Sequence, residues 1–348
     1  MKNPFVTNGY VSPEYFCDRE KETAKIVSLL TNENNIALIS PRRLGKTDLL
    51  RHCFGQPEIK EHYHTFIIDI YATSSVRDFV NVFGKAVLDE LRPKGKSVWG
   101  TFLNVLASLR SEITFDMNGQ PTWGIGLGAI TNPSATLDEI FSYLNNAGKP
   151  CLIAIDEFQQ ITKYADDPNI EAALRTHIQR CSNAHFVFSG SHRHLMGAMF
   201  TSPARPFYQS VTLINLPPIS VDKYAEFCLR HFERASKHLD TLVVTELYER
   251  FNGITSYMQK VMNILFSMTG TGEICIPSMI DTAINDLLDF SADTYDALLY
   301  QMPEKQRIVF MAIAAEGKAK AISSGDFVRK YKLQSASSVS SAVKGLLE

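Results

Sequence analysis

Short, mostly apolar runs alternate with helix-like segments through the first two thirds of the chain. The runs begin the segments 35–40, 64–71, 150–161, 184–196 and 211–216. Runs of this length, rich in Ile, Val and Phe, are typical of strands buried on both faces. Because helical patterns separate them, the strands are expected to run parallel. The sequence predicts an α/β domain in which helices cover both faces of a parallel five-stranded sheet.

Composition limits the class of protein. The chain has 348 residues, 45% of them hydrophobic and 21% charged, which excludes a disordered chain and suggests about two or three domains. A net charge of −2 argues against general polyanion binding but leaves a local basic patch open. The six cysteines form no C-x-x-C pair, and there is no signal-peptide core or membrane-length apolar run. We expect a cytoplasmic protein without membrane contact.

The loop after the first strand resembles a phosphate-binding loop. Residues 40–47 read SPRRLGKT, which matches G-x-x-x-x-G-K-[ST] except for Ser40 at the first glycine. Gly45 would let the backbone approach phosphates, Lys46 would reach the β- and γ-phosphates, and Thr47 would bind Mg²⁺. The alternative to a phosphate-binding loop is a helix that polar residues cap by chance. For Arg42 and Arg43, the alternative to phosphate contact is a pair of solvated side chains. The predicted loop contacts are Ser40, Pro41, Arg42, Arg43, Leu44, Gly45, Lys46, Thr47 and Asp48.

Two later strands end in residues that complete such a site. The run 151–158 closes with Asp156, which can hold Mg²⁺ through water, and Glu157, which can polarise a water for attack on the γ-phosphate. The run 185–193 is predicted to lie between the other two strands, with Ser189 or Ser191 near the γ-phosphate. Alone, the first could be two acids that solvate a strand end, and the second could be an ordinary polar turn. Together with the loop they predict an ATP and Mg²⁺ site.

Three regions follow from the pattern of elements. Residues 1–217 form the α/β domain, and Asp18 is expected to cap its first helix within 16–32. A helix over 97–109 and a β-hairpin around Asn118-Gly119, about 111–130, interrupt this domain.

The remainder is predicted to be all-helical. Residues 218–300 form a helical domain with helices at 221–235, 239–251, 255–269, 277–287 and 291–299. Residues 301–348 carry three short helices, at about 304–315, 323–331 and 336–347, whose spacing is typical of a helix-turn-helix unit. The wing of a winged helix would lie beyond Glu348.

Six segments in order resemble one family over nearly the whole chain. They are FCDREKE, SPRRLGKTDLL, CLIAIDEFQQI, FVFSGSHRHLM, SPARPFYQSVTLINLPPIS and FNGITSYMQKVMN. The chain resembles the ATPases common in archaea and also found in Bacteroides-type bacteria, which belong to the AAA-like signal-transduction (STAND) NTPases. Two departures from the family are Ser40 at the first loop glycine and Thr255 at the usual proline of the helical lid.

The resemblance implies a P-loop ATPase domain, a helical lid and a C-terminal winged helix. It places Phe16 and Arg19 near the adenine, and it places the segment with Gly253 and Tyr257 in the lid that closes over the base. It matches Ser189 to a sensor of the γ-phosphate. It matches Arg205 to a family arginine that approaches the γ-phosphate or a neighbouring subunit, which implies nucleotide-dependent self-association.

Three function classes stay open. The first is a regulatory ATPase that binds ATP or ADP, hydrolyses ATP slowly with Mg²⁺ and couples this to rearrangement of the lid and winged helix. The second is a DNA-binding initiator of the origin-recognition type, and the third is a nucleotide-stabilised scaffold for an unknown protein partner. Residues 301–348 carry eight Lys/Arg and four Asp/Glu, so DNA binding there is open, although the last helix is poor in base-reading side chains.

Overall fold

The computed structural model describes residues 2–91, 113–115, 121–123, 132–317 and 319–347. The chain divides into two compact units, Met1–Ile280 and Asp281–Glu348, and each is described by itself. The predicted boundary between an α/β domain and a helical domain near residue 217 lies inside the first unit and stays a prediction.

A five-stranded parallel sheet organises the first unit, as the sequence predicts. The strand order is β2-β5-β6-β1-β7, so β6 lies between the strand that precedes the predicted phosphate-binding loop and the strand that ends in acids. This position of β6 confirms the expectation from the sequence. The strands are β1 (Ile36–Ile39), β2 (His64–Asp69), β5 (Cys151–Asp156), β6 (Ala184–Gly190) and β7 (Thr212–Asn215).

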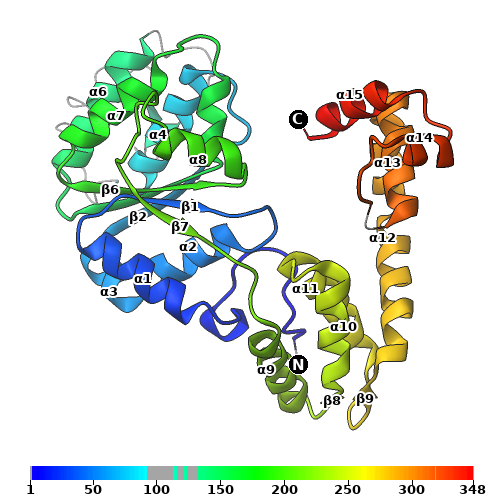
Figure 1. Cartoon of the computed structure of the whole chain (residues 1–348). Coiled ribbons are helices and arrows are strands. Elements are labelled where there is room, and N and C mark those ends of the chain that lie inside the picture. Colours follow the sequence, from blue (N-terminus) through cyan, green and yellow to red (C-terminus); the bar gives the residue numbers. More distant parts are fainter. Residues whose placement is uncertain (1, 92–112, 116–120, 124–131, 318, 348) are drawn as a thin grey trace. The chain divides into compact units, whose positions relative to one another are not determined.

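Helices cover both faces of this sheet (Figure 1). Side chains alternate along β1, so that Ile36 and Leu38 join one hydrophobic cluster while Ala37 and Ile39 join the other. The first cluster is closed by α1 (Glu20–Thr31), α2 (Lys46–Phe54) and α3 (Pro57–His62). The second is closed by α4 (Val76–Glu90), α6 (Pro133–Asn145), α7 (Ile170–Arg180) and α8 (Arg193–Thr201).

The entry to α1 differs from the prediction. Asp18 does not cap the helix, because the N-cap residue is Arg19 and no side chain accepts a capping hydrogen bond there. Asp18 and Arg19 both have positive φ, 55° and 75°, so the chain turns sharply into the helix. The Arg19 guanidinium instead donates to Glu22 at 2.8 Å and to the carbonyl of Pro217 at 2.7 Å. Arg19 thereby joins the start of α1 to the segment after β7.

The predicted hairpin is confirmed in its strands. β3 (Ile113–Phe115) pairs antiparallel with β4 (Pro121–Trp123). The Asn118-Gly119 turn and the helix expected over 97–109 lie outside the described residues.

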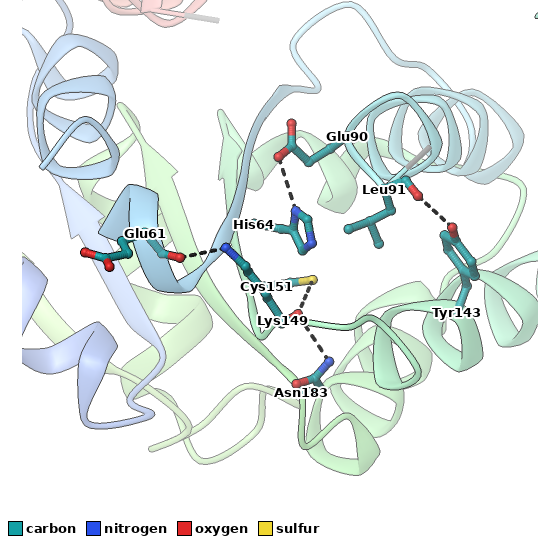
Figure 2. Close-up of polar contacts among 8 residues, drawn as sticks. All are labelled: Glu61, His64, Glu90, Leu91, Tyr143, Lys149, Cys151 and Asn183. Atoms are coloured by element: carbon teal, nitrogen blue, oxygen red, sulfur yellow. Dashed lines mark hydrogen bonds and ion pairs between the residues drawn. The ribbon is translucent and has the colours of Figure 1, made fainter. Parts of the chain in front are cut away.

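Polar contacts fix the amino edge of the sheet (Figure 2). The ammonium of Lys149, just before β5, donates to the carbonyl of Glu61 at 2.7 Å. The Tyr143 hydroxyl on α6 donates to the carbonyl of Leu91 at 2.8 Å, and burial raises the pKa of this tyrosine to about 12. Backbone carbonyls of the connecting segments at this edge therefore find hydrogen-bond donors within the protein. The opposite, carboxyl edge carries the polar residues that the sequence singles out.

A helical region completes the first unit. It contains α9 (Val221–Arg234), α10 (Thr241–Phe251), α11 (Thr255–Met268), the short 3-10 helix η4 (Pro277–Met279) and a small parallel pair, β8 (His238–Leu239) with β9 (Ile274–Cys275). The N-terminal segment packs into this region through Phe5, which is fully buried against Phe227, Phe232 and Phe266. From this anchor the segment runs past a 3-10 turn, η1 (Pro13–Tyr15), to α1.

In its described residues the second unit consists of helices joined by turns and loops, without strands. Two helices expected at 277–287 and 291–299 are wrong, because one helix, α12 (Ile280–Gln301), spans 22 residues. Its sequence contains no Gly or Pro that would end it. The three short helices are confirmed as α13 (Glu304–Glu316), α14 (Gly325–Lys330) and α15 (Ala336–Leu347).

A small core holds these last three helices together, with Val309, Val339 and Ala342 at its centre. Across the described part of the whole chain, no helix has both the length and the apolar character needed to cross a bilayer.

Candidate functional site

A cleft of about 590 Å³ lies at the carboxyl edge of the sheet. Six segments of the first unit line it: the N-terminal segment, the loop after β1, the ends of β2 and β5, the segment after β7 and the start of α11. The lining includes Val6, Tyr10, Phe16, Arg19, Arg42, Arg43, Leu44, Gly45, Lys46, Thr47, Asp48, Asp69, Tyr71, Asp156, Glu157, Thr255, Ser256 and Gln259. Residues 42–48 of the predicted phosphate loop, the acidic strand end and both predicted base-side residues therefore meet in one cavity, whereas Ser40 and Pro41 do not line it.

The loop between β1 and α2 needs unusual backbone conformations. Gly45, immediately before α2, has φ 83°, a left-handed conformation that glycine adopts without strain. Lys46 is only 6% exposed, and its ammonium donates to the carbonyls of Ser40 (3.1 Å) and Pro41 (3.4 Å). Burial lowers the pKa of Lys46, while the charges of Glu157 and Asp156 oppose this shift. The loop thus folds around the buried ammonium of Lys46. This group lies at the N-terminus of α2, where bound anions are favoured.

Thr47 and Asp156 meet across the sheet edge. The Thr47 hydroxyl donates to Oδ2 of Asp156 at 2.5 Å, and Asp156 is almost fully buried. A hydroxyl and a carboxylate at the N-terminus of α2 are the hard oxygen ligands that Mg²⁺ prefers. The oxygens of Thr47 and Asp156 therefore suit the Mg²⁺ that the sequence predicts at this position.

Glu157 follows with a left-handed backbone, φ 54°. Its Oε2 accepts from the Ser191 hydroxyl at 2.7 Å and from the Gln159 amide at 2.5 Å. Arg42 donates in turn to Ser191 at 3.4 Å. A chain of contacts thus joins the phosphate loop, the end of β6 and the glutamate.

Aromatic rings form the other end of the cleft. Phe16 stacks on His52 with ring centroids 4.4 Å apart, and the Tyr10 ring meets both edge-on. Burial lowers the pKa of His52, which favours its neutral ring beside these aromatics. A flat apolar wall of this kind suits a nucleobase.

The phosphate loop also contacts the helical region. The Arg43 guanidinium lies 4.8 Å from the centre of the Tyr257 ring and donates to its hydroxyl. The backbone N–H of Ser256 donates to the carbonyl of Arg43 at 3.2 Å. We call these three contacts the loop–helix clasp. Tyr257 itself does not line the cleft but holds a residue that does.

Three further predicted residues lie behind the cleft lining or away from it. Ser189 is fully buried in β6, and its hydroxyl lacks a hydrogen-bond partner among the described residues. Arg205 forms an ion pair with Glu171 on α7 instead of facing the cleft. Gly253 has φ 68° and packs closely against Tyr248 and Pro218, so it shapes the entry to α11.

The lining side chains that sequence reasoning missed include Tyr10, Asp69, Tyr71 and Gln259. Asp69 ends β2 in register with Asp156, so a second acid-terminated strand was a signal in the sequence. Tyr71 supports Arg42, whose guanidinium lies 5.3 Å from its ring centre. Nothing in the local pattern around Tyr10 or Gln259 indicates that the N-terminal segment and α11 meet at this cavity.

Comparison with known families agrees with this geometry. The family model of an ATPase domain predominantly from Archaea matches residues 16–261, and a probable winged helix domain matches residues 293–348. The chain belongs to this ATPase family. The matched range contains the phosphate loop, the acidic strand end and the start of α11. The narrower assignment to the STAND class stays a prediction. No curated protein matches the chain significantly.

Solved structures share the fold of this chain. The Walker-type ATPase paby2304 of Pyrococcus abyssi is 19% identical, with a TM-score of 0.60, over 90% of this chain and 83% of that one. The ORC1 protein of Aeropyrum pernix, solved in complex with DNA, is 13% identical, with a TM-score of 0.58, over 99% and 87%. The ORC2 protein of the same organism, solved as ADPNP-ADP complexes, is 14% identical, with a TM-score of 0.58, over 95% and 82%.

The phosphate loop yields a prediction about Gly45. An added Cβ would meet nothing within 4 Å, so Gly45→Ala should cost only the strain of its positive φ, about 1–2 kcal/mol of unfolding free energy. Gly148→Ala is the control, because that site is equally open and has no positive φ. It should be neutral or stabilise by about 0.4–1 kcal/mol. Chemical denaturation without nucleotide measures both, and equal effects would contradict the assigned role of Gly45.

Proposed function

We propose that this chain binds ATP in the cleft and hydrolyses it with Mg²⁺. The observation that carries the proposal is the convergence of Lys46, Thr47, Asp156 and Glu157 at the N-terminus of α2. These groups come from two segments about a hundred residues apart and face one cavity. A cation, two metal-binding oxygens and a carboxylate base are the set that phosphoryl transfer to water requires.

Each residue has a defined task in this proposal. The loop N–H groups and Lys46 hold the β- and γ-phosphates, and Lys46 exchanges its bonds to the loop carbonyls for phosphate oxygens. Thr47 and Asp156 would hold Mg²⁺, which when bound neutralises charge on the phosphates. Glu157 accepts the proton of the attacking water, and the rings of Tyr10 and Phe16, which line the cleft, receive the adenine.

The first test is ATP turnover by wild type, Lys46→Ala and Glu157→Gln. Loss of Lys46 should weaken ATP binding about 10- to 100-fold, because one charge-assisted contact disappears. Glu157→Gln should keep binding while reducing kcat about 10²- to 10⁴-fold, since the amide cannot accept the proton. Titration calorimetry and phosphate release measure the two effects separately.

Two results would contradict this scheme. An absence of nucleotide binding by wild type would remove the ATPase proposal altogether. Binding without turnover, unchanged in Glu157→Gln, would favour the nucleotide-stabilised scaffold. Lys163→Ala serves as a surface control for the charge change at Lys46, because Lys163 is exposed and does not line the cleft.

We further infer that nucleotide binding is coupled to the helical region through the loop–helix clasp. Arg43 adopts a positive φ of 70°, a conformation that costs free energy for a residue other than glycine. Its side chain is held by Tyr257 and its carbonyl by Ser256. A ligand that reshapes the phosphate loop would therefore move the start of α11, in keeping with the predicted lid.

Tyr257→Leu should weaken ATP binding about three- to tenfold, because the loop loses the ring that orders Arg43. Tyr257→Phe is the matched control, since it retains the ring and removes only the hydroxyl, and it should stay within about twofold of wild type. Hydrogen exchange should show faster exchange of the Ser256 amide in Tyr257→Leu. Unchanged exchange and affinity would separate the clasp from nucleotide binding.

A second candidate function is DNA binding by the second unit. It is supported by the match to a winged helix domain, by the net charge of +4 over 301–348 and by the fold shared with a protein solved on DNA. Arg329 and Lys330 are engaged in ion pairs with Asp326 (2.5 Å) and Glu316 (2.7 Å). Lys332 and Lys344, both exposed, are therefore the better candidates for phosphate contacts.

Duplex binding should fall steeply with salt, and Lys332→Ala and Lys344→Ala should each lower the slope of log K against log salt by about one. Lys163→Ala in the first unit should leave the slope unchanged. Fluorescence anisotropy between about 50 and 200 mM salt measures it. Binding that is insensitive to salt, or absent at the lowest salt, would exclude this candidate. Turnover stimulated by duplex would favour an initiator-type ATPase.

A further inference from the structure

Two consecutive glutamines, Gln159 and Gln160, follow the acidic end of β5, and their side-chain amides donate to different kinds of partner. Both lie in the 3-10 helix η3 (Phe158–Lys163). The Gln160 amide donates to the backbone carbonyl of Thr73 at 2.9 Å, an ordinary structural contact. The Gln159 amide donates instead to Oε2 of Glu157 at 2.5 Å.

We propose that Gln159 is a positioning residue that orients Glu157 for attack by water. This inference rests on the proposed ATPase function and adds a residue to its machinery. Gln159 and Ser191 donate to the same oxygen, Oε2. Since both donors occupy one oxygen, they fix the rotation of the carboxylate and leave Oε1 to accept a proton from water at the cleft.

The direction of the Gln159 amide follows from its partner. An ionised carboxylate only accepts hydrogen bonds, so the NH₂ group must face Glu157 and the amide oxygen must face away. That oxygen is buried and lacks a hydrogen-bond partner among the described residues. Burying an unpaired acceptor is unfavourable, and a glutamine with a purely structural role would pair it. The amide oxygen of Gln159 therefore stays unpaired while its NH₂ group keeps the contact with Glu157.

Gly190, at the end of β6, makes room for this arrangement. A Cβ at this position would lie 2.4 Å from Oε1 of Gln159 and 2.5 Å from Cγ of Met196. Gly190 has no positive φ, so the glycine is required by space and not by backbone conformation. Gln159 is 4% exposed, so its amide is confined between Gly190 and Glu157.

The test compares Gln159→Met with Gln160→Met. Both changes keep the length of the side chain and remove the amide, but only the first removes a donor to Glu157. Gln159→Met should lower kcat roughly 10- to 100-fold while the KM for ATP and the affinity for ADP stay within about twofold. Gln160→Met should leave kcat within about twofold. Melting temperatures of both variants report whether the fold is retained.

Gly190→Ala gives an independent route to the same result. The added methyl displaces the Gln159 amide and the Met196 side chain without changing either residue type, so kcat should fall with nucleotide affinity retained. This variant also decides the matter if Gln159→Met does not fold. Wild-type or higher kcat in a folded Gln159→Met or Gly190→Ala protein would overturn the proposal, as would equal losses in Gln159→Met and Gln160→Met.

Glu157→Gln separates this inference from the function on which it rests. If Glu157→Gln abolishes turnover while Gln159→Met does not alter it, the ATPase proposal stands and the role of Gln159 fails. If Glu157→Gln retains wild-type turnover, the assignment of Glu157 itself fails and takes the role of Gln159 with it.

Discussion

The hydrogen bond between Thr47 and Asp156 depends on the parallel pairing of three strands. β6 pairs with β1 on one side and with β5 on the other, so the carboxyl ends of all three meet at one edge. This register brings together two residues 109 positions apart in the chain. The loop after β1 and the acids after β5 would otherwise be unrelated polar segments. The rest of the cleft is arranged around this edge.

Three charged side chains at that edge have polar partners within the protein. Lys46 bonds loop carbonyls, Asp156 bonds Thr47, and Glu157 bonds Ser191 and Gln159. Such pairing lowers the free-energy cost of keeping charged groups away from water. Under the proposed function, a bound phosphate would replace the contacts of Lys46 with the loop carbonyls.

The cleft is built from the N-terminal segment and the helical region as well as from the sheet. Phe5 anchors the segment among the aromatic side chains of α9 and α11, and a few residues later Tyr10 and Phe16 form the apolar end of the cavity. Arg43 ties the phosphate loop to the start of α11. The phosphate loop and the N-terminal segment therefore each contact the helical region.

The sequence by itself determined the five parallel strands, the order of the polar strand ends and the membership of the phosphate loop and the acidic pair in one site. These follow from local patterns, because apolar periodicity and the Gly-Lys-Thr motif are properties of short segments. The sequence did not determine that Arg19 starts α1 with a left-handed backbone, that one long helix replaces two, or that Arg205 pairs with Glu171. Only the tertiary structure decided these points, and only it showed that Gln159 bonds Glu157 while Gln160 bonds the carbonyl of Thr73. Each depends on which partner lies across a packed interface, and spacing along the chain does not encode that.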